Sequence, residues 1–276
     1  MGILNVTPDS FSDGGRFVDH ADAVAHGLRL AAAGAAIVDV GGESTRPGAH
    51  PVGVAEEIDR VVPVVTGLAG HVRVSVDTAK PEVAAAAVAA GATLVNDVSA
   101  SLHEVAADHG VGWIAMHMQG EPRTMQEHPR YDDVAAEVAE HLVARAEAAR
   151  RAGVDEVWID PGIGFGKTYA HNWALLAALP ELCAAGWPVA VGTSRKAFLG
   201  AALAAPGTGD GSVAVVPVDD RLEGSVATAV HAAACGADIV RVHDVAATVA
   251  ALAAAGTPAR SSQEDGPDQR ESSPWL

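Results

Sequence analysis

The sequence is poor in aromatic residues, in cysteine and in positive charge. Aromatic residues make up 4% of its 276 residues, and alanine supplies much of the 49% hydrophobic share, which is typical of closely packed helices. Its two cysteines, Cys183 and Cys235, form no CxxC pair and no metal-ligand spacing. We therefore expect two buried thiols that stay reduced in the cytoplasm.

Charge and hydropathy exclude two classes of partner. Lysine and arginine total 18 against 35 for aspartate and glutamate, which gives a formal net charge of −17. A charge of this sign repels polyanions, so we expect neither a nucleic acid nor an anionic membrane as partner. The longest uncharged stretches, such as Val245–Ala259, are shorter than the ~20 apolar residues of a membrane-spanning helix. An anionic small substrate would need a local cluster of positive groups.

Short apolar runs alternate with alanine-rich amphipathic stretches along the whole chain. The expected strands are Gly2–Leu4, Ala36–Val40, Val72–Val76, Thr93–Val95, Gly112–Met116, Glu156–Ile159, Val189–Val191 and Ile239–Val242. The expected helices are Ala21–Ala33, Ala55–Ala69, Pro81–Ala90, Leu102–Asp108, Asp133–Ala152, Asn172–Leu179, Leu222–Cys235 and Val245–Ala255. The expected caps are Asp132 and Asp244 at helix N-termini and Gly34, Gly91, Gly153, Gly236 and Gly256 at C-termini.

This alternation predicts an α/β protein with a closed (β/α)₈ barrel, a TIM barrel, in a single domain over residues 1–256. A doubly wound open sheet is the alternative fold. The polar tail 257–276 is expected to be disordered, and Ala205–Asp220 is expected to form a surface excursion.

Polar residues follow the expected strands, at the barrel face where active sites of this fold lie. Asp77, Asn96 and Asp160 supply acceptors and one amide, a set that suits a flat heterocycle with amino and ring N–H donors. The alternative is that both aspartates only cap the helices that follow them. His117 is expected to be a hydrogen-bonded core histidine, and Met118 beside it could pack on a ligand face.

Positive groups follow the last two strands, where barrels of this class often bind phosphate. They are Arg195 and Lys196 after the seventh strand and Arg241 and His243 at the eighth. Closure of the barrel would place Asn5 beside this cluster. An uncharged oxygen ligand next to a phosphate site suits Mg²⁺, which takes few protein ligands.

The segment Asp160–Lys167, DPGIGFGK, is not a nucleotide-binding loop. Pro161 stands where a P-loop needs glycine, and the glycine spacing also differs from GxGxxG. We expect a flexible wall that places Phe165 beside a flat ligand and leaves Lys167 solvated. The glycine-rich segments Asn5–Arg16 and Gly41–Gly48 are expected to fold over the barrel mouth as lids, or else to be plain surface loops.

Taken together, these segments resemble the bacterial dihydropteroate synthase family. The matching segments, in the family's order, are MGILNVTPDSFSDGG, VDVGGESTRPG, VSVDT, NDVSA, MHMQGEPRTMQ, DPGIGFGK, GTSRKAFLG and RVHDV. The resemblance implies a pterin-binding barrel that condenses 6-hydroxymethyl-7,8-dihydropterin diphosphate with 4-aminobenzoate by a dissociative mechanism, with Mg²⁺ as cofactor and a homodimer as assembly. One departure is Ala197, where many members carry serine.

The resemblance also implies a role for each matching residue. Asp77, Asn96, Asp160 and Lys196 would bind the pterin, with Met118 and Phe165 as its apolar walls. Arg241 and His243 would bind the diphosphate, and Asn5 would bind Mg²⁺. Phe11, Asp13, Thr45, Arg46 and Pro47 would close around aminobenzoate, and Thr45 would also touch the diphosphate. Asp77, Lys196, Arg241 and His243 would be catalytic.

Two other functions use the same kind of barrel. A non-catalytic pterin-binding paralogue would keep the fold but should have damaged lid or SRK segments, and both are intact here. A pterin-dependent methyltransferase also binds a pterin through Asp and Asn. Its folate substrate has no diphosphate, so it would not need Asn5, Arg241 and His243 together.

Overall fold

The computed structural model describes residues 1–7, 19–44, 51–204 and 216–257. Its strands are β1 Gly2–Asn5, β2 Ile37–Gly41, β3 Arg73–Asp77, β4 Leu94–Asp97, β5 Gly112–Met116, β6 Val157–Asp160, β7 Ala190–Val191 and β8 Ile239–Val240. Its helices are α1 His20–Ala32, α2 Val54–Leu68, α3 Pro81–Ala89, α4 His103–His109, α5 Val134–Ala152, α6 Tyr169–Ala177, α7 Leu179–Cys183, α8 Ala197–Leu203, the 3₁₀ turn η1 Val218–Asp220, α9 Leu222–Ala234 and α10 Val245–Ala254.

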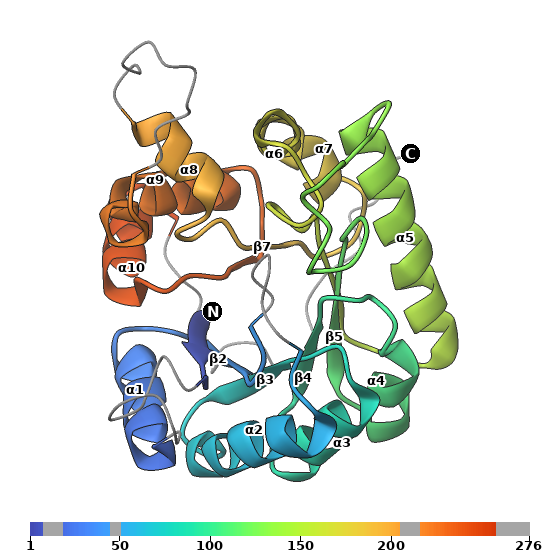
Figure 1. Ribbon diagram of the computed structural model, residues 1–276, viewed down its shortest axis with the longest axis vertical. Coiled ribbons are helices and arrows are strands. Elements are labelled where there is room, and N and C mark those ends of the chain that lie inside the picture. The colour runs from blue at the N-terminus through green and yellow to red at the C-terminus, as the bar shows by residue number, and fades with distance from the viewer. Residues whose placement is uncertain (8–18, 45–50, 205–215, 258–276) are drawn as a thin grey trace, which may run out of the picture.

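Helices surround the strands (Figure 1), which form two parallel sheets, one of six strands and one of two. Strands β1 to β6 pair in chain order, and β7 pairs with β8. Isolated parallel bridges complete the ring, from Ile159 to Val189 and from Val242 to Gly2. The backbone hydrogen bond from Ile3 N to Val242 O is 2.9 Å long. The closed barrel is therefore confirmed, and the open sheet is excluded.

Apolar side chains pack on both sides of the strands. A small cluster of Ile37, Leu94, Ile114, Ala190 and Ile239 fills the barrel interior. The larger core lies between the barrel and its helices, where the other faces of the strands, Val38 and Val40 among them, pack on the amphipathic helices. Because side chains alternate along a strand, each strand divides its residues between these two cores. No helix in the described ranges is long and apolar enough to cross a lipid bilayer.

Several local expectations need correction. Asp133, not Asp132, caps α5, accepting hydrogen bonds from Ala135 N and Ala136 N at 3.0 and 3.1 Å. Asp244 precedes α10 but makes no side-chain cap, because its carboxylate pairs with Arg195. Cys183 and Cys235 are free thiols, half-buried rather than fully buried. The five glycines expected at helix C-termini all lie just after helices, and each of these glycines has a positive φ.

The region after β6 contains two helices where one was expected, because Thr168 caps α6 and a second short helix, α7, begins at Leu179 with Pro180 in its first turn. Helix α8 was not expected. Residues 205–215 of the expected surface excursion and residues 258–276 of the expected tail lie outside the described residues.

The glycines of the turn after β6 allow two backbones to meet. A Cβ on Gly162, which has φ +64°, would lie 1.8 Å from the carbonyl oxygen of His117. A Cβ on Gly166, with φ +61°, would lie 2.2 Å from the carbonyl oxygen of Gln119. The turn is therefore pressed against the chain that leaves β5. Its glycines serve this close approach rather than the flexibility that the sequence suggested.

Replacing Gly162 with alanine should destabilise the protein far more than the same change at Gly153. Both glycines have positive φ, but no atom of the described residues lies within 4 Å of a Cβ on Gly153. Gly153→Ala should cost about 1–2 kcal/mol of unfolding free energy, because only backbone strain is added. Gly162→Ala should cost at least ~3 kcal/mol, because the backbone at His117 must also move. Urea denaturation measures both values, and equal losses would contradict the packing argument.

Candidate active site

The strand register brings polar residues of the first four strands to one level of the barrel. Asn5 lies opposite Gly41, Gly41 opposite Asp77, and Asp77 opposite Asn96. Three residues far apart in the chain, Asn5, Asp77 and Asn96, therefore stand at the same rim. Asp160 ends β6 opposite Met116 of β5.

The barrel interior changes from apolar to polar within two residues along three strands. The apolar positions are Ile37, Leu94 and Ile239. Two residues further on, and so on the same face of each strand, stand Asp39, Asn96 and Arg241. These three side chains meet inside the barrel.

Arg241 joins two carboxylates at the centre of this polar layer. Its Nε donates to Asp39 Oδ2 at 2.6 Å, and its Nη2 donates to Asp77 Oδ2 at 2.5 Å. Asn96 Nδ2 donates to the same oxygen of Asp39 at 2.9 Å. The other carboxylate oxygen of Asp39 and of Asp77, Oδ1 in each, is buried without a partner among the described residues. The layer can therefore accept further hydrogen bonds.

Sequence reasoning missed Asp39. Its side chain has no exposed surface, yet it carries a carboxylate in the middle of the apolar strand β2. A buried charge is costly unless it is paired, so this position itself was a signal for an inward-facing cation. The cation is Arg241, which the resemblance assigned to the diphosphate.

Burial and nearby charges together shift the pKa values of Asp77 and Asp160. Burial raises the pKa of Asp77 to about 7, and Asp39, Glu57 and Asp97 add to the rise, while the Arg241 guanidinium opposes it. Burial likewise raises the pKa of Asp160 above its usual range, against the positive charges of Lys196 and Arg241. Neither aspartate caps the following helix: Asp160 Oδ1 accepts from Gly162 N at 2.7 Å, and Asp77 pairs with Arg241.

Lys196 lies beside Asp160 and against the turn after β6. Its Nζ donates to the carbonyl oxygen of Ile163 and lies 4.7 Å from the centre of the Phe165 ring. Burial lowers the pKa of Lys196 to about 8, and the charge of Asp160 opposes the fall. Phe165 is half-buried, as expected of a wall residue, and half-buried Met118 follows β5. The Phe165 ring, the Lys196 amine and the Asp160 carboxylate thus lie close together at the barrel mouth.

The two remaining basic residues at this rim, His243 and Arg195, have different partners. His243 Nδ1 lies 3.0 Å from Ser194 Oγ, which holds the ring at the end of β8. Arg195 was expected in the phosphate cluster, but its guanidinium makes two hydrogen bonds to Asp244 at 2.7 and 3.0 Å. We therefore leave Arg195 out of the candidate binding set.

The expectation that Lys167 is solvated is wrong. Its exposed fraction is 1%, and its Nζ lies 3.0 Å from His117 Nδ1. Burial lowers the pKa of His117 to about 3, so the ring is neutral and Nδ1 accepts this bond. His117 is buried and hydrogen-bonded, as a core histidine should be. Nothing in the sequence pattern marked Lys167 as buried.

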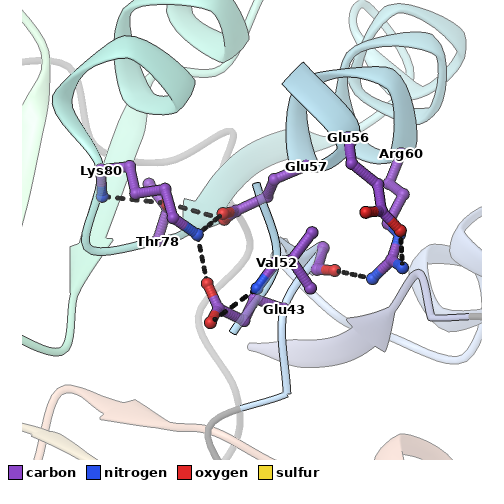
Figure 2. Close-up of polar contacts among 8 residues, drawn as sticks. Glu43, Val52, Glu56, Glu57, Arg60, Thr78 and Lys80 are labelled. Atoms are coloured by element: carbon purple, nitrogen blue, oxygen red, sulfur yellow. Dashed lines mark hydrogen bonds and ion pairs between the residues drawn. The ribbon is translucent and has the colours of Figure 1, made fainter. Parts of the chain in front are cut away.

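A second cluster outside the barrel anchors the chain that leaves β2 (Figure 2). Lys80 Nζ donates to the carboxylates of Glu43 and of Glu57, which is fully buried. Glu43 Oε1 also accepts from Val52 N at 3.3 Å, so it joins the two sides of the second glycine-rich segment. Arg60 Nη1 donates to the carbonyl oxygen of Gly42 at 2.7 Å.

Five predicted binding residues lie outside the described residues: Phe11, Asp13, Thr45, Arg46 and Pro47. Asn5 is half-buried at the end of β1, where the resemblance put a metal ligand. Within the described ranges, no three His, Cys, Asp or Glu side chains form a metal-binding group.

The Asp39–Arg241 pair should show strong coupling in stability. Asp39→Ala leaves Arg241 with one carboxylate and should cost ~3 kcal/mol, as expected when one partner of a buried pair is removed. Arg241→Met should cost a similar amount. The double variant should be more stable than the sum of the single losses predicts, by at least ~1 kcal/mol. Urea denaturation of the three variants measures this coupling, and additive losses would show that the two charges stand independently.

Comparison of the sequence with known proteins finds relatives that are dihydropteroate synthases. The dihydropteroate synthases of Mycobacterium leprae (strain TN) and Escherichia coli (strain K12) are 50% and 48% identical to this chain. The alignments cover 93% and 91% of this chain and 92% and 88% of those proteins.

Comparison with solved structures also finds dihydropteroate synthases. Xanthomonas albilineans dihydropteroate synthase with 4-aminobenzoic acid has a TM-score of 0.81 and 50% identity, covering 92% of this chain and 90% of that one. The Yersinia pestis enzyme with a sulfonamide drug has a TM-score of 0.82 and 45% identity, covering 92% and 91%. The family described as pterin binding enzyme matches residues 1–243, so this chain belongs to the pterin-binding enzyme family.

Proposed function

We propose that this chain is a dihydropteroate synthase, an enzyme that joins 6-hydroxymethyl-7,8-dihydropterin diphosphate to 4-aminobenzoate and releases 7,8-dihydropteroate and pyrophosphate. The observation that carries the proposal is the convergence of Asp77, Asp160, Lys196 and Arg241, whose charges act on one another at one barrel mouth. Relatives of this chain support it, since the Xanthomonas albilineans enzyme has been solved with 7,8-dihydropteroate at 47% identity.

The pterin would lie between the turn after β6 and the polar layer. Asp160 would accept from the ring N–H and the 2-amino group, and Asn96 would hold the same edge. Lys196 has three donors, of which the carbonyl of Ile163 takes one, so it can also donate to the pterin carbonyl oxygen. Phe165 and Met118 would cover the two faces of the ring.

The reaction would begin with cleavage of the bond between the exocyclic methylene carbon and the diphosphate oxygen. The electron pair leaves with pyrophosphate, whose growing charge Arg241 and His243 neutralise. The cation left on the methylene carbon is delocalised into the pterin ring and stabilised by the Asp77 carboxylate. The aryl amine of aminobenzoate, which is neutral near pH 7, attacks this carbon and then loses a proton to solvent. A strong general base is not required.

We further propose Mg²⁺ as cofactor with Asn5 as a protein ligand. The donor set fits this ion, because one amide oxygen beside a diphosphate site leaves the remaining positions to phosphate oxygens and water. When bound, Mg²⁺ would neutralise charge on the leaving pyrophosphate. Phe11, Asp13, Thr45, Arg46 and Pro47 would close around aminobenzoate, and the Glu43–Lys80 cluster fixes the base of the segment that carries the last three.

Purified protein with Mg²⁺, pterin diphosphate and aminobenzoate should form 7,8-dihydropteroate and pyrophosphate in equal amounts. Lys196→Met should lower kcat/KM by about 10²-fold or more, as removal of a group aimed at the reacting ligand does. Arg151→Met, which removes an exposed cation far from the mouth, is the matched control and should leave kcat/KM unchanged. Liquid chromatography of the product and a pyrophosphate assay give both readouts.

Two results would exclude the proposal, and a third would exclude one residue role within it. Pterin binding without turnover would identify a non-catalytic paralogue. Methyl transfer from a methylated folate would identify a pterin-dependent methyltransferase. Full activity of Lys196→Met would remove the assigned role of that residue.

We also propose a homodimer that forms through an exposed apolar face. Helices α6, α8 and α9 border a cavity of about 430 Å³ with Trp173, Leu199, Leu203 and Ala227 in its lining. Trp173 and Leu203 are each 43% exposed, which is unusual for such large apolar side chains unless a partner covers them.

Free thiols at both cysteines support a cytoplasmic location.

Replacing Trp173 with aspartate should convert a dimer into a monomer, because it puts a charge into the centre of this face. Tyr169→Asp is the matched control: Tyr169 is 41% exposed on the same helix but does not line the cavity. Light scattering after size exclusion should give twice the chain mass for the wild type and for Tyr169→Asp. A monomeric wild type, or a dimeric Trp173→Asp, would overturn this interface.

A further inference from the structure

Side chains hold four consecutive carbonyl groups of the turn after β6. The donor–acceptor pairs are Lys196 to Ile163, Gln126 to Gly164, Lys167 to Phe165 and Tyr131 to Gly166. Such dense anchoring fixes the backbone of the segment that presents the Phe165 ring. Three of these donors come from outside the segment, whereas Lys167 folds back onto its own turn.

Lys167 is the most buried of these donors, with 1% of its surface exposed. Its Nζ lies 3.0 Å from His117 Nδ1, 3.2 Å from His117 O and 3.0 Å from Phe165 O. These three acceptors match the three donors of an ammonium group. In the described part of the chain, no carboxylate forms an ion pair with it at 4.0 Å or less.

This geometry ties two elements together at one atom. His117 leaves β5, and Phe165 lies in the turn after β6, so a single amine joins the ends of neighbouring strands. The glycine contacts described above press the same two backbones together at Gly162 and Gly166. The side chain that carries this amine is buried, with 1% of its surface exposed.

Two groups at the barrel mouth depend on where this turn lies. The Phe165 ring belongs to the residue whose carbonyl Lys167 holds, and the Lys196 amine lies 4.7 Å from the centre of that ring. The same Lys196 amine donates to the Ile163 carbonyl two residues earlier. A shift of the turn would therefore move the aromatic wall and the cation together.

We propose that Lys167 is a positioning residue for pterin binding: its buried amine ties the Phe165 carbonyl to the end of β5 and so sets the places of the Phe165 ring and the Lys196 ammonium. The inference rests on the proposed function. Burial lowers the pKa of the Lys167 amine to about 7; in its charged form this amine also favours the ionised form of Asp160, whose pKa burial raises.

The test compares Lys167→Met with Tyr131→Phe. Lys167→Met keeps the length of the side chain and removes its donors and charge. Tyr131→Phe removes one hydrogen bond to the adjacent Gly166 carbonyl, 2.9 Å long, and leaves the charge in place. Readouts are the dissociation constant of 6-hydroxymethylpterin from its fluorescence quenching, the KM of each substrate, kcat, and Tm.

Lys167→Met should weaken pterin binding about tenfold, the size expected when a charged hydrogen-bond donor is lost. The KM for pterin diphosphate should rise by the same factor, while the KM for aminobenzoate stays within about twofold. Tyr131→Phe should change the pterin dissociation constant by less than about threefold. Lys167→Arg, which keeps charge and donors, should recover most of the lost affinity.

The outcomes separate this inference from the proposed function. If the wild type forms no dihydropteroate, the function fails, whereas unchanged pterin binding by Lys167→Met in an active background overturns the positioning role alone. A lower Tm with an unchanged pterin dissociation constant would show a purely structural lysine. Should Lys167→Met not fold, Lys167→Gln, which keeps two N–H donors without the charge, decides by the ratio of the KM for pterin diphosphate to the KM for aminobenzoate.

Discussion

The contact on which the site depends is the guanidinium of Arg241 between the carboxylates of Asp39 and Asp77. Asp39 is fully buried, so without this cation its charge would be strongly unfavourable inside the barrel. The bonds from Arg241 to Asp39 and Asp77 also link the chain at the end of β8 to β2 and β3, at the level where the interior changes from apolar to polar. Among the residues that the structure describes, Oδ1 of Asp39 and Oδ1 of Asp77 have no hydrogen-bond partner, so this layer can accept further hydrogen bonds from a ligand.

The second requirement is a fixed wall beside that layer. Glycines at 162 and 166 let the turn after β6 touch the backbone that leaves β5, and four side chains then hold its carbonyl groups. A wall fixed in this way presents an aromatic ring and an ammonium at a defined separation. Preorganisation of this kind lowers the cost of ordering a site when a ligand binds. We attribute the burial of Lys167 to this demand.

Much of the fold and most of the rim could be predicted from the sequence. Alternating apolar runs predicted the barrel, and polar residues at strand ends predicted the ring of Asn5, Asp77, Asn96 and Asp160, because parallel strands end at one face. Side-chain partners could not be predicted in the same way. Arg195 and Arg241 follow neighbouring strands, yet only the three-dimensional structure shows that Asp244 engages the first and Asp39 the second. Lys167 was misjudged because no periodic pattern marks a residue buried within a turn.

The most direct test of the account is a calorimetric titration of the pterin diphosphate, with Mg²⁺ and without aminobenzoate, into the wild type and into Asp160→Asn. The account predicts one site per chain in the wild type and an affinity at least about tenfold lower in Asp160→Asn, since one of the two acceptor oxygens of the carboxylate becomes an NH2 donor that would face the N–H donors of the pterin. Equal affinities, or no binding to the wild type, would contradict the claim that this barrel mouth holds a pterin.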